Sequence, residues 1–241
     1  MRRVHPTSLL GSWRAHGRLR VELWESPCIV MTPPSLGLDD DACDALVNPA
    51  NERLQGTLFT PSECSSKLRN NIIYPPQAVD GIVSELGGAE LAAACMALPE
   101  VAPGGTRCAT GEAVLTPAFG ELLMSYNKLV HTCAPLYCGD SEWRRATTAC
   151  YHSAFDVAQD AGLAVVASPL LGAGARGAPI RAASNAAAAA VSSWHPHGDS
   201  TMSTGRAGLR VVRFAVQESS IAETLSEAFE MVLKPIGEDG M

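Results

Sequence analysis

The chain has 241 residues with a formal net charge of −7, 46% hydrophobic residues and 18% charged residues. This composition is typical of a globular protein with a sizeable core. The acidic balance argues against a nucleic-acid backbone or an anionic membrane as partner, and no segment is long and apolar enough to span a membrane. A small anionic ligand remains compatible, because backbone N–H groups and helix amino ends bind phosphate without net positive charge.

The first 18 residues are expected to form a basic arm. The first 21 residues hold five arginines and no acidic residue. An organellar transit segment is the alternative, although serine is sparse and the segment leads directly into an apparent strand. Residues 19–241 are expected to form a single domain with an insertion at about 57–78.

The first half of that domain contains two predicted strands and one helix. Alternating apolar and polar residues predict a strand over 19–24, and a short apolar run before a turn signal predicts a strand over 44–47. Residues 56–77 are rich in Pro, Ser, Asn and Thr without periodicity, which is typical of a functional loop or insertion. A helix is expected over 80–98, with a break at Gly87–Gly88.

The second half of the chain alternates strands and helices. The expected elements are strands around Leu115 and over 128–136, 163–167 and 209–216, and helices over 142–161 and 179–194. A capping box of Ser220 and Glu223 is expected to open a last helix, whose apolar face would hold Ile221, Leu225, Phe229 and Val232. This alternation, with several fully apolar strands, predicts an α/β fold whose mixed, mostly parallel sheet is covered on both faces.

The eight cysteines contain no C-x-x-C pair and no Cys/His spacing typical of zinc. Most lie in apolar runs, as Cys95 does, which is typical of reduced, buried thiols in an intracellular protein, either cytoplasmic or nuclear. His195 and His197 are close in sequence but lack further nearby ligands, so no metal site is expected.

Two asparagines mark the end of the strand predicted over 44–47. Pro49 favours an extended conformation at Asn48 and cannot continue a hydrogen-bonded ladder. Asn51 is therefore expected just past the carboxyl end of the strand, where open α/β sheets bind their ligands. The donor and acceptor of its amide suit a pair of sugar hydroxyls. The alternative is that both asparagines only stabilise a turn.

A glycine-rich loop, residues 172–177, lies between an apolar strand and a helix with Pro179 in its first turn. Small residues let the backbone approach a ligand closely. Successive N–H groups in such a loop can bind an anion, helped by the positive end of the helix, and the geometry suits a pyrophosphate. The loop matches neither the Walker A motif nor G-x-G-x-x-G, and a tight strand-to-helix connection is the alternative.

These features occur in an order that resembles the macrodomain family of ADP-ribose-binding modules. Residues 44–51 resemble the V-N-A-A-N signature, and residues 79–81 resemble the V-D-G step that opens the first ligand-facing helix. The matching motifs span about residues 19 to 217. The remaining matches are residues 88–95 with G-x-x-L-x-x-x-C, 108–113 with C-x-T-G-E-A, 128–132 with K-x-V-I-H-T, and 171–179 with I-S-T-G-V-Y-G-Y-P.

The resemblance implies a three-layer α/β/α sandwich with the ligand in a cleft at the strand ends. It implies that Asn51 contacts the ribose distal to adenine, and that Asp80 lies near that ribose and positions or activates water in hydrolysing members. Asn48 is a further ligand-binding candidate, whereas His131 is expected to be a satisfied core histidine. The resemblance also implies that the diphosphate is wrapped by backbone N–H groups of Gly172, Ala173, Gly174, Ala175, Arg176 and Gly177.

Three departures from the family pattern affect this site. The usual glycine run after the asparagine motif is mostly absent, and the aromatic residue of the second loop is replaced by Arg176, which can pair with a phosphate or face solvent. The acidic residue that contacts adenine is not recognisable, and Glu25 is the nearest candidate after the first strand. Polar residues of the insertion are candidates for rebuilding the missing loop: Ser62, Ser65, Ser66, Asn70 and Asn71.

By this resemblance the chain is expected to bind ADP-ribose and to hydrolyse mono-ADP-ribose from modified proteins, with a carboxylate ester as the linkage. Asp80 would orient or deprotonate the water and Asn51 would fix the ribose, with no metal or other cofactor. The alternative for Asp80 is a helix N-cap. The alternative functions are a non-catalytic ADP-ribose reader and an O-acetyl-ADP-ribose deacetylase. The expected partners are ADP-ribose and ADP-ribosylated proteins, with no nucleic acid and no membrane, and the chain is expected to be a monomer.

Overall fold

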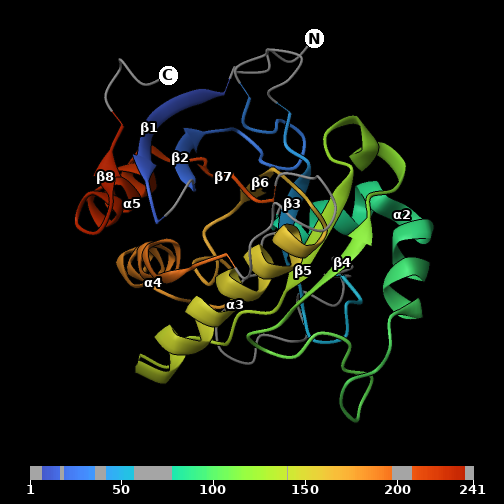
Figure 1. Ribbon diagram of the computed structural model, residues 1–241. Helices are drawn as coiled ribbons and strands as arrows, with labels where there is room; N and C mark the ends of the chain where they lie inside the picture. Colours follow the sequence, from blue (N-terminus) through green and yellow to red (C-terminus); the bar gives the residue numbers. More distant parts are fainter. Residues whose placement is uncertain are drawn as a thin grey trace.

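The computed structural model describes residues 7–16, 19–35, 42–56, 78–139, 141–196 and 208–236. Within these ranges an eight-stranded sheet has the order β4-β5-β3-β6-β7-β2-β1-β8 (Figure 1). The strands are β1 Ser8–Arg14, β2 Arg20–Glu25, β3 Ala45–Pro49, β4 Ala113–Pro117, β5 Lys128–Thr132, β6 Val165–Ser168, β7 Val211–Val216 and β8 Lys234–Pro235.

The centre of the sheet is parallel. Strands β5, β3, β6, β7 and β2 run in one direction. Among the described strands of the sheet, the antiparallel ones are β4 on one side and β1 with β8 on the other. Central parallel strands must be apolar on both faces, and β7 is buried at every position. The arrangement gathers the carboxyl ends of five strands at one end of the sheet, where ligand sites of α/β proteins occur.

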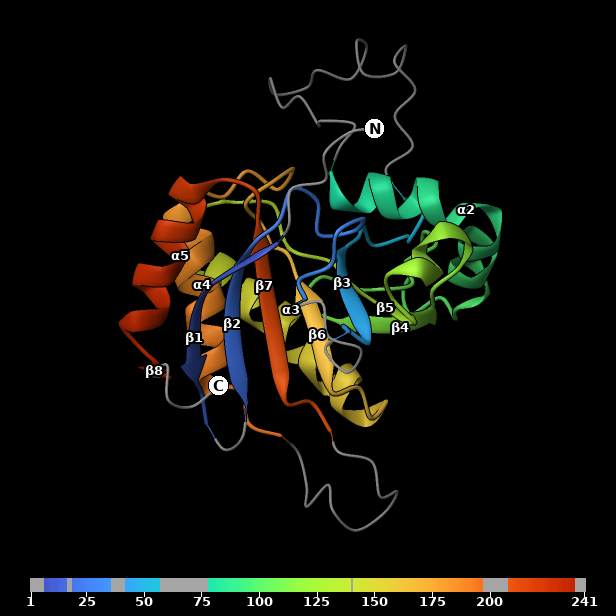
Figure 2. The ribbon, with the colours of Figure 1, turned by 90° about the horizontal axis from the view of Figure 1, so that it is seen from above.

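Helices cover both faces of the sheet (Figures 1 and 2). Val47, Val130 and Val212 point into a core shared with α3 Ser141–Asp160, α4 Ile180–Ser193 and α5 Ser219–Glu230. Their neighbours along the strands, such as Leu46 and Leu129, point the other way, toward α2 Val79–Ala97 and the short helix η1 Gly120–Met124. This alternation of side chains across each strand builds two cores and confirms the predicted three-layer α/β/α sandwich.

Most predicted elements are present, with shifted ends. Helix α2 carries the predicted interruption, since Gly88 leaves helical geometry at φ 58° and ψ −155°. The predicted capping box is wrong: α5 starts at Ser219, its N-cap is Glu218, and no side chain of the described residues caps it. Val232 lies beyond that helix and is 49% exposed, so it does not extend the apolar face.

Strand β1 lies within the N-terminal segment for which no strand was predicted. It pairs with β2, and its register shifts between Leu9 and Gly11. This irregularity and the exposed positions of an outer strand weaken the alternation that would have revealed it. The strand predicted over 128–136 ends at Thr132, and Cys133 continues the pairing only through an isolated bridge with Thr110.

The seven described cysteines are all free thiols, and Cys64 lies outside the described residues. Cys43, Cys95, Cys108, Cys133 and Cys150 are buried. Burial raises the pKa of Cys95 to about 11, with the charge of Asp80 adding to the effect, so this thiol stays protonated near neutral pH. Among the helices that the structure describes, none combines the length and apolarity needed to cross a bilayer.

Candidate functional site

A cleft of about 610 Å³ opens at the carboxyl ends of the parallel strands. Its walls come from the segments at the carboxyl ends of β2, β3, β5, β6 and β7 and from the amino end of α2. This volume falls within the range of pockets that bury a ligand of nucleotide or drug size. The lining residues lie within 26–29, 49–56, 78–82, 169–176 and 215–217, together with Ala134 after β5.

The glycine-rich loop forms one wall of the cleft. It is closed by two backbone bonds, from the Gly177 N–H to the Gly174 carbonyl and from the Ala178 N–H to the Gly172 carbonyl, each 2.9 Å. Within the described ranges, the backbone N–H groups of residues 173–176 have no hydrogen-bond acceptor. Consecutive unsatisfied donors beside a cleft are the arrangement that binds phosphate groups.

Glycine is required at the start of this loop. Gly172 has φ +84°, a conformation that side chains rarely adopt. A Cβ at this position would also lie 3.0 Å from the Trp143 ring, which packs beneath the loop. The loop geometry is therefore tied to the packing of α3 against the sheet.

The lining also includes Asp80, in the first turn of α2. The N-cap of α2 is Ala78, so the carboxylate of Asp80 is not the helix cap. Its Oδ1 instead accepts a hydrogen bond of 2.9 Å from Nδ2 of Asn48 at the end of β3. Asp80 is 6% exposed, lines the cleft, and lies at the positive end of the α2 dipole.

Asn48 connects Asp80 to a buried histidine. Its Nδ2 also lies 3.1 Å from Nδ1 of His131 on β5, and Nε2 of His131 lies 2.9 Å from the hydroxyl of Thr116 on β4. Both ring nitrogens have partners, which confirms the expectation of a satisfied core histidine. Burial lowers the pKa of His131 to about 4, so the ring is neutral near pH 7.

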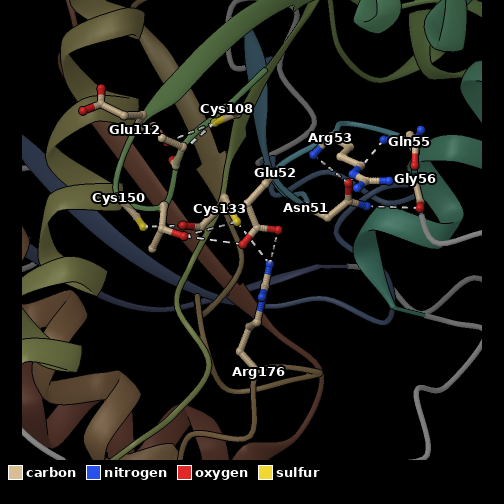
Figure 3. Close-up of polar contacts among 12 residues, drawn as sticks. Asn51, Glu52, Arg53, Gln55, Gly56, Cys108, Glu112, Cys133, Cys150 and Arg176 are labelled. Atoms are coloured by element: carbon tan, nitrogen blue, oxygen red, sulfur yellow. Dashed lines mark hydrogen bonds and ion pairs between the residues drawn. The ribbon is translucent and has the colours of Figure 1, made fainter. Parts of the chain in front are cut away.

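Asn51 lines the cleft, and its amide holds the chain that follows it (Figure 3). Its Oδ1 accepts the N–H groups of Arg53 and Gln55 at 3.1 and 3.3 Å, and its Nδ2 donates to the Gly56 carbonyl at 3.2 Å. Asn51 therefore stabilises the turn over residues 51–56 at the edge of the cleft. The second hydrogen of Nδ2 has no acceptor within the part of the chain that the structure describes.

An ion pair links the two loops that line the cleft (Figure 3). Nη2 of Arg176 lies 3.6 Å from Oε2 of Glu52 and donates to Sγ of Cys133 at 3.1 Å. Burial raises the pKa of Glu52, but hydrogen bonds from its own backbone and from Cys133, together with the charge of Arg176, outweigh this and lower it. The cleft therefore has one carboxylate and one guanidinium facing each other at its rim.

The Macro domain family model matches residues 47–187, which covers the end of β3, α2 and the glycine-rich loop. The chain belongs to the macrodomain family. The match is more than half of the chain and includes Asn48, Asn51 and Asp80.

Relatives of this macrodomain include bacterial proteins described only as macro domain-containing. One from Ralstonia nicotianae is 30% identical over 139 residues, covering 57% of this chain and 64% of that protein. One from Xanthomonas campestris is 27% identical over 177 residues, covering 73% of this chain and 80% of that protein. The chain thus spans less than two thirds of the Ralstonia protein, and neither description states an activity.

Solved structures share the fold of this macrodomain. A mutant Oceanobacillus iheyensis macrodomain superposes with a TM-score of 0.68 at 17% identity, covering 96% of each chain. A Trypanosoma brucei macrodomain in complex with ADP-ribose superposes with a TM-score of 0.57 at 21% identity, covering 86% of this chain and 68% of that one. At these identities the likeness establishes the fold and nothing finer.

The structure brings some predicted site residues of the macrodomain together and separates others. Asn51, Asp80, Gly172, Gly174, Ala175 and Arg176 line the cleft. Asn48 lies beneath the surface at 2% exposure, and Ala173, Gly177 and Glu25 are not part of the lining. The polar candidates of the insertion, at 62–71, lie outside the described residues.

Other lining residues were missed in the sequence. Ser26 and Cys28 follow β2, Gln217 follows β7, and Glu52 follows Asn51. The signal available for the first three was their place after the carboxyl end of a parallel strand, which is where ligands bind in this class of sheet. Glu52 directly follows the signature, but its role depends on a partner far along the chain, which no local pattern reveals.

His131 is expected to make folding stability depend on pH between about 6.5 and 4. As pH falls below 6.5 the unfolded chain takes up a proton that the folded protein resists until about pH 4, so the free energy of unfolding decreases. His131 changes the free energy of unfolding by at most about 1.4 kcal/mol per pH unit, and this contribution to the slope vanishes above pH 6.5. The groups facing the ring are Asn48, Thr116 and Cys95, with Asp80 behind Asn48.

Urea unfolding at pH 7.5, 6 and 5 measures this dependence. The wild type should lose stability more steeply than His131→Leu, while exposed His195→Gln should follow the wild type. Equal slopes for the wild type and His131→Leu would contradict a depressed pKa at His131.

Proposed function

We propose that this macrodomain binds ADP-ribose in the cleft and releases mono-ADP-ribose from protein carboxylates by hydrolysis. The observation that carries the proposal is the presence, in one cleft, of the consecutive donors of residues 173–176 and of Asp80 on the amino end of α2. The first feature suits a diphosphate and the second suits activation of water at the sugar beside it. The ADP-ribose complex of the Trypanosoma brucei relative supports the ligand by analogy.

Binding would proceed through the backbone of the glycine-rich loop and the side chain of Arg176. The backbone donors are already oriented by the Gly177–Gly174 and Ala178–Gly172 hydrogen bonds, so little ordering is needed when the ligand enters. The positive end of α2 favours the ligand's negative charge. Asn51 would use its remaining amide hydrogen on the distal ribose, and its other polar groups are already held by the turn.

The chemical step would add water across the bond between the anomeric carbon of the distal ribose and the ester oxygen. As this bond breaks, its electron pair stays on the leaving protein carboxylate, and the water oxygen bonds to the anomeric carbon. Asp80 would accept the proton of the water and return it to solvent. The products are ADP-ribose and the free protein carboxylate. Binding energy from the diphosphate would hold the sugar against Asp80 during this step.

A non-catalytic reader is the second candidate, and one observation favours it. The amide of Asn51 already makes three hydrogen bonds within the turn over 51–56, which limits the hydrogen bonds that it can make to the distal ribose. Titration calorimetry with ADP-ribose, AMP and free ribose 5-phosphate tests binding, which both candidates require. Tight binding of ADP-ribose but not of AMP is expected; equal weak binding of all three would contradict both.

Release assays separate the candidates. Incubation with a glutamate-linked ADP-ribosylated protein and with O-acetyl-ADP-ribose should release free ADP-ribose from the first substrate if the hydrolase proposal holds. Turnover of O-acetyl-ADP-ribose alone would favour a deacetylase. Binding without turnover of either substrate would favour the reader.

Arg176 and Glu52 are expected to change ligand affinity in opposite directions. Arg176→Ala removes a charge-assisted contact with the diphosphate and should weaken ADP-ribose binding about 10- to 100-fold. Glu52→Gln removes a competing anion from Arg176 and should strengthen binding about threefold. Calorimetry measures both, with Arg181→Ala as control, since Arg181 pairs with Glu227 at 3.2 Å on the surface away from the cleft. A loss of affinity on Glu52→Gln would contradict the competition.

A further inference from the structure

The amide of Asn48 is held in one orientation by its neighbours. Asn48 is 2% exposed, and its Nδ2 lies 2.9 Å from Oδ1 of Asp80 and 3.1 Å from Nδ1 of His131. A carboxylate at Asp80 can only accept hydrogen bonds, so the nitrogen of the amide must face it. This orientation leaves Oδ1 of Asn48 buried without a partner among the described residues. Because the oxygen of this amide is unpaired, both hydrogen bonds of the Asn48 side chain, to Asp80 and to His131, are made by its nitrogen.

His131 supplies the second of those contacts. An amide nitrogen has two hydrogens and no free lone pair, so the Nδ1 atom that faces it must be the unprotonated, accepting nitrogen. The proton of the neutral ring then sits on Nε2, which donates to the hydroxyl of Thr116 at 2.9 Å. Burial keeps the ring neutral, as the lowered pKa of His131 indicates. The donors and acceptors in the hydrogen-bonded chain of Thr116, His131, Asn48 and Asp80 are therefore fixed: His131 donates to Thr116, and Asn48 donates to both His131 and Asp80.

We propose that His131 is a positioning residue for Asp80, which acts through Asn48 by fixing the direction of the amide N–H that holds the carboxylate at the cleft. The inference rests on the proposed function only where it assigns Asp80 a role in hydrolysis. His131 does not line the cleft, so its effect on the ligand is indirect, and the hydrogen bonds through Asn48 are the route that we propose.

Without the acceptor nitrogen of His131, the orientation of the Asn48 amide would no longer be fixed. The Asn48 amide could then turn its oxygen toward another donor, and the carboxylate of Asp80 would lose the hydrogen bond that favours its ionised form. The carboxylate would become harder to ionise and less well oriented. Because a catalytic group displaced by about 1 Å can lose about 100-fold in rate, kcat should fall while ligand affinity stays nearly unchanged.

Two substitutions of His131 separate positioning from simple packing. His131→Leu fills the site without an acceptor, whereas His131→Asn offers an amide oxygen near the place of Nδ1. In His131→Leu we expect a higher pKa for Asp80 than in the wild type, measured by ¹³C NMR of the labelled carboxyl group. We also expect kcat for ADP-ribose release to fall about 100-fold and the Kd for ADP-ribose to stay within about threefold. His131→Asn should restore most of kcat.

The outcomes distinguish this inference from the proposed function. An unchanged pKa of Asp80 in folded His131→Leu, or equal losses of kcat in both variants, would overturn the positioning role while leaving hydrolysis intact. A raised pKa of Asp80 in a protein whose wild type releases no ADP-ribose would support the positioning and overturn the hydrolase. Should His131→Leu fail to fold, ¹⁵N NMR of the wild-type ring decides: protonation on Nε2 is expected, and protonation on Nδ1 would overturn the inference.

Discussion

Replacing Asp80 by asparagine is expected to lower kcat for ADP-ribose release by about 10²- to 10⁴-fold, the usual contribution of a positioned general base. The amide keeps the size of the side chain and an oxygen that can still accept the hydrogen bond from Asn48, so the fold and the cleft should survive. In the proposed mechanism, the substitution removes the capacity of this side chain to take a proton from water. Steady-state release from a glutamate-linked substrate measures the loss, and calorimetry should show ADP-ribose still bound.

The matched control is Asp160→Asn, at the exposed carboxyl end of α3, which should leave kcat unchanged. Full activity in Asp80→Asn would mean that another group activates the water, and the mechanism proposed above would be wrong. A parallel loss of ADP-ribose affinity would instead assign Asp80 to binding.

Replacing Arg213 by methionine is expected to lower the free energy of unfolding by about 3 kcal/mol, since removal of one partner strands a buried charge. Arg213 is 1% exposed, and its Nε donates to Glu22 at 2.8 Å, which is itself 4% exposed. The guanidinium also lies over the Trp24 ring, 5.5 Å from its centroid. The decrease in the free energy of unfolding should be at the low end of the range for broken buried ion pairs, because Arg20 remains 2.8 Å from Glu22.

The same substitution should also disturb the segment after β2 that lines the cleft. Nη1 of Arg213 donates to the Pro34 carbonyl at 2.8 Å, at the end of the segment that begins with the lining residues Ser26 and Cys28. Urea unfolding measures stability, and Arg181→Met provides the control because its exposed pair with Glu227 should contribute less than about 1 kcal/mol. Equal effects of the two substitutions would show that the buried pair adds nothing beyond a surface pair.

The features predictable from the sequence were those encoded locally. The apolar run 45–47 followed by Pro49 placed Asn51 at the end of a strand, and Gly88 marked the break in α2 through its freedom at positive φ. The prediction of a capping box was wrong because Ser220 lies inside the helix, one residue after its start, and so is not the N-cap residue. Local patterns locate a helix but fix its first residue only to within one or two positions.

The contacts that shape the site were not predictable in the same way. Asn48, Asp80 and His131 come from β3, α2 and β5, and only the parallel pairing of β3 with β5 brings the first and third together. The pair of Glu52 and Arg176 likewise joins two loops from distant strands. Sequence motifs identified most of these residues, but their partners depend on the order of strands in the sheet.

The most direct test of the proposed function is release of free ADP-ribose by the wild-type protein from a glutamate-linked, auto-modified protein substrate, followed over time at enzyme concentrations well below substrate. The proposal predicts multiple turnovers with the unmodified carboxylate regenerated on the target protein. No release, on a substrate that a known hydrolase clears completely, would contradict hydrolysis and leave ADP-ribose binding as the function to be tested.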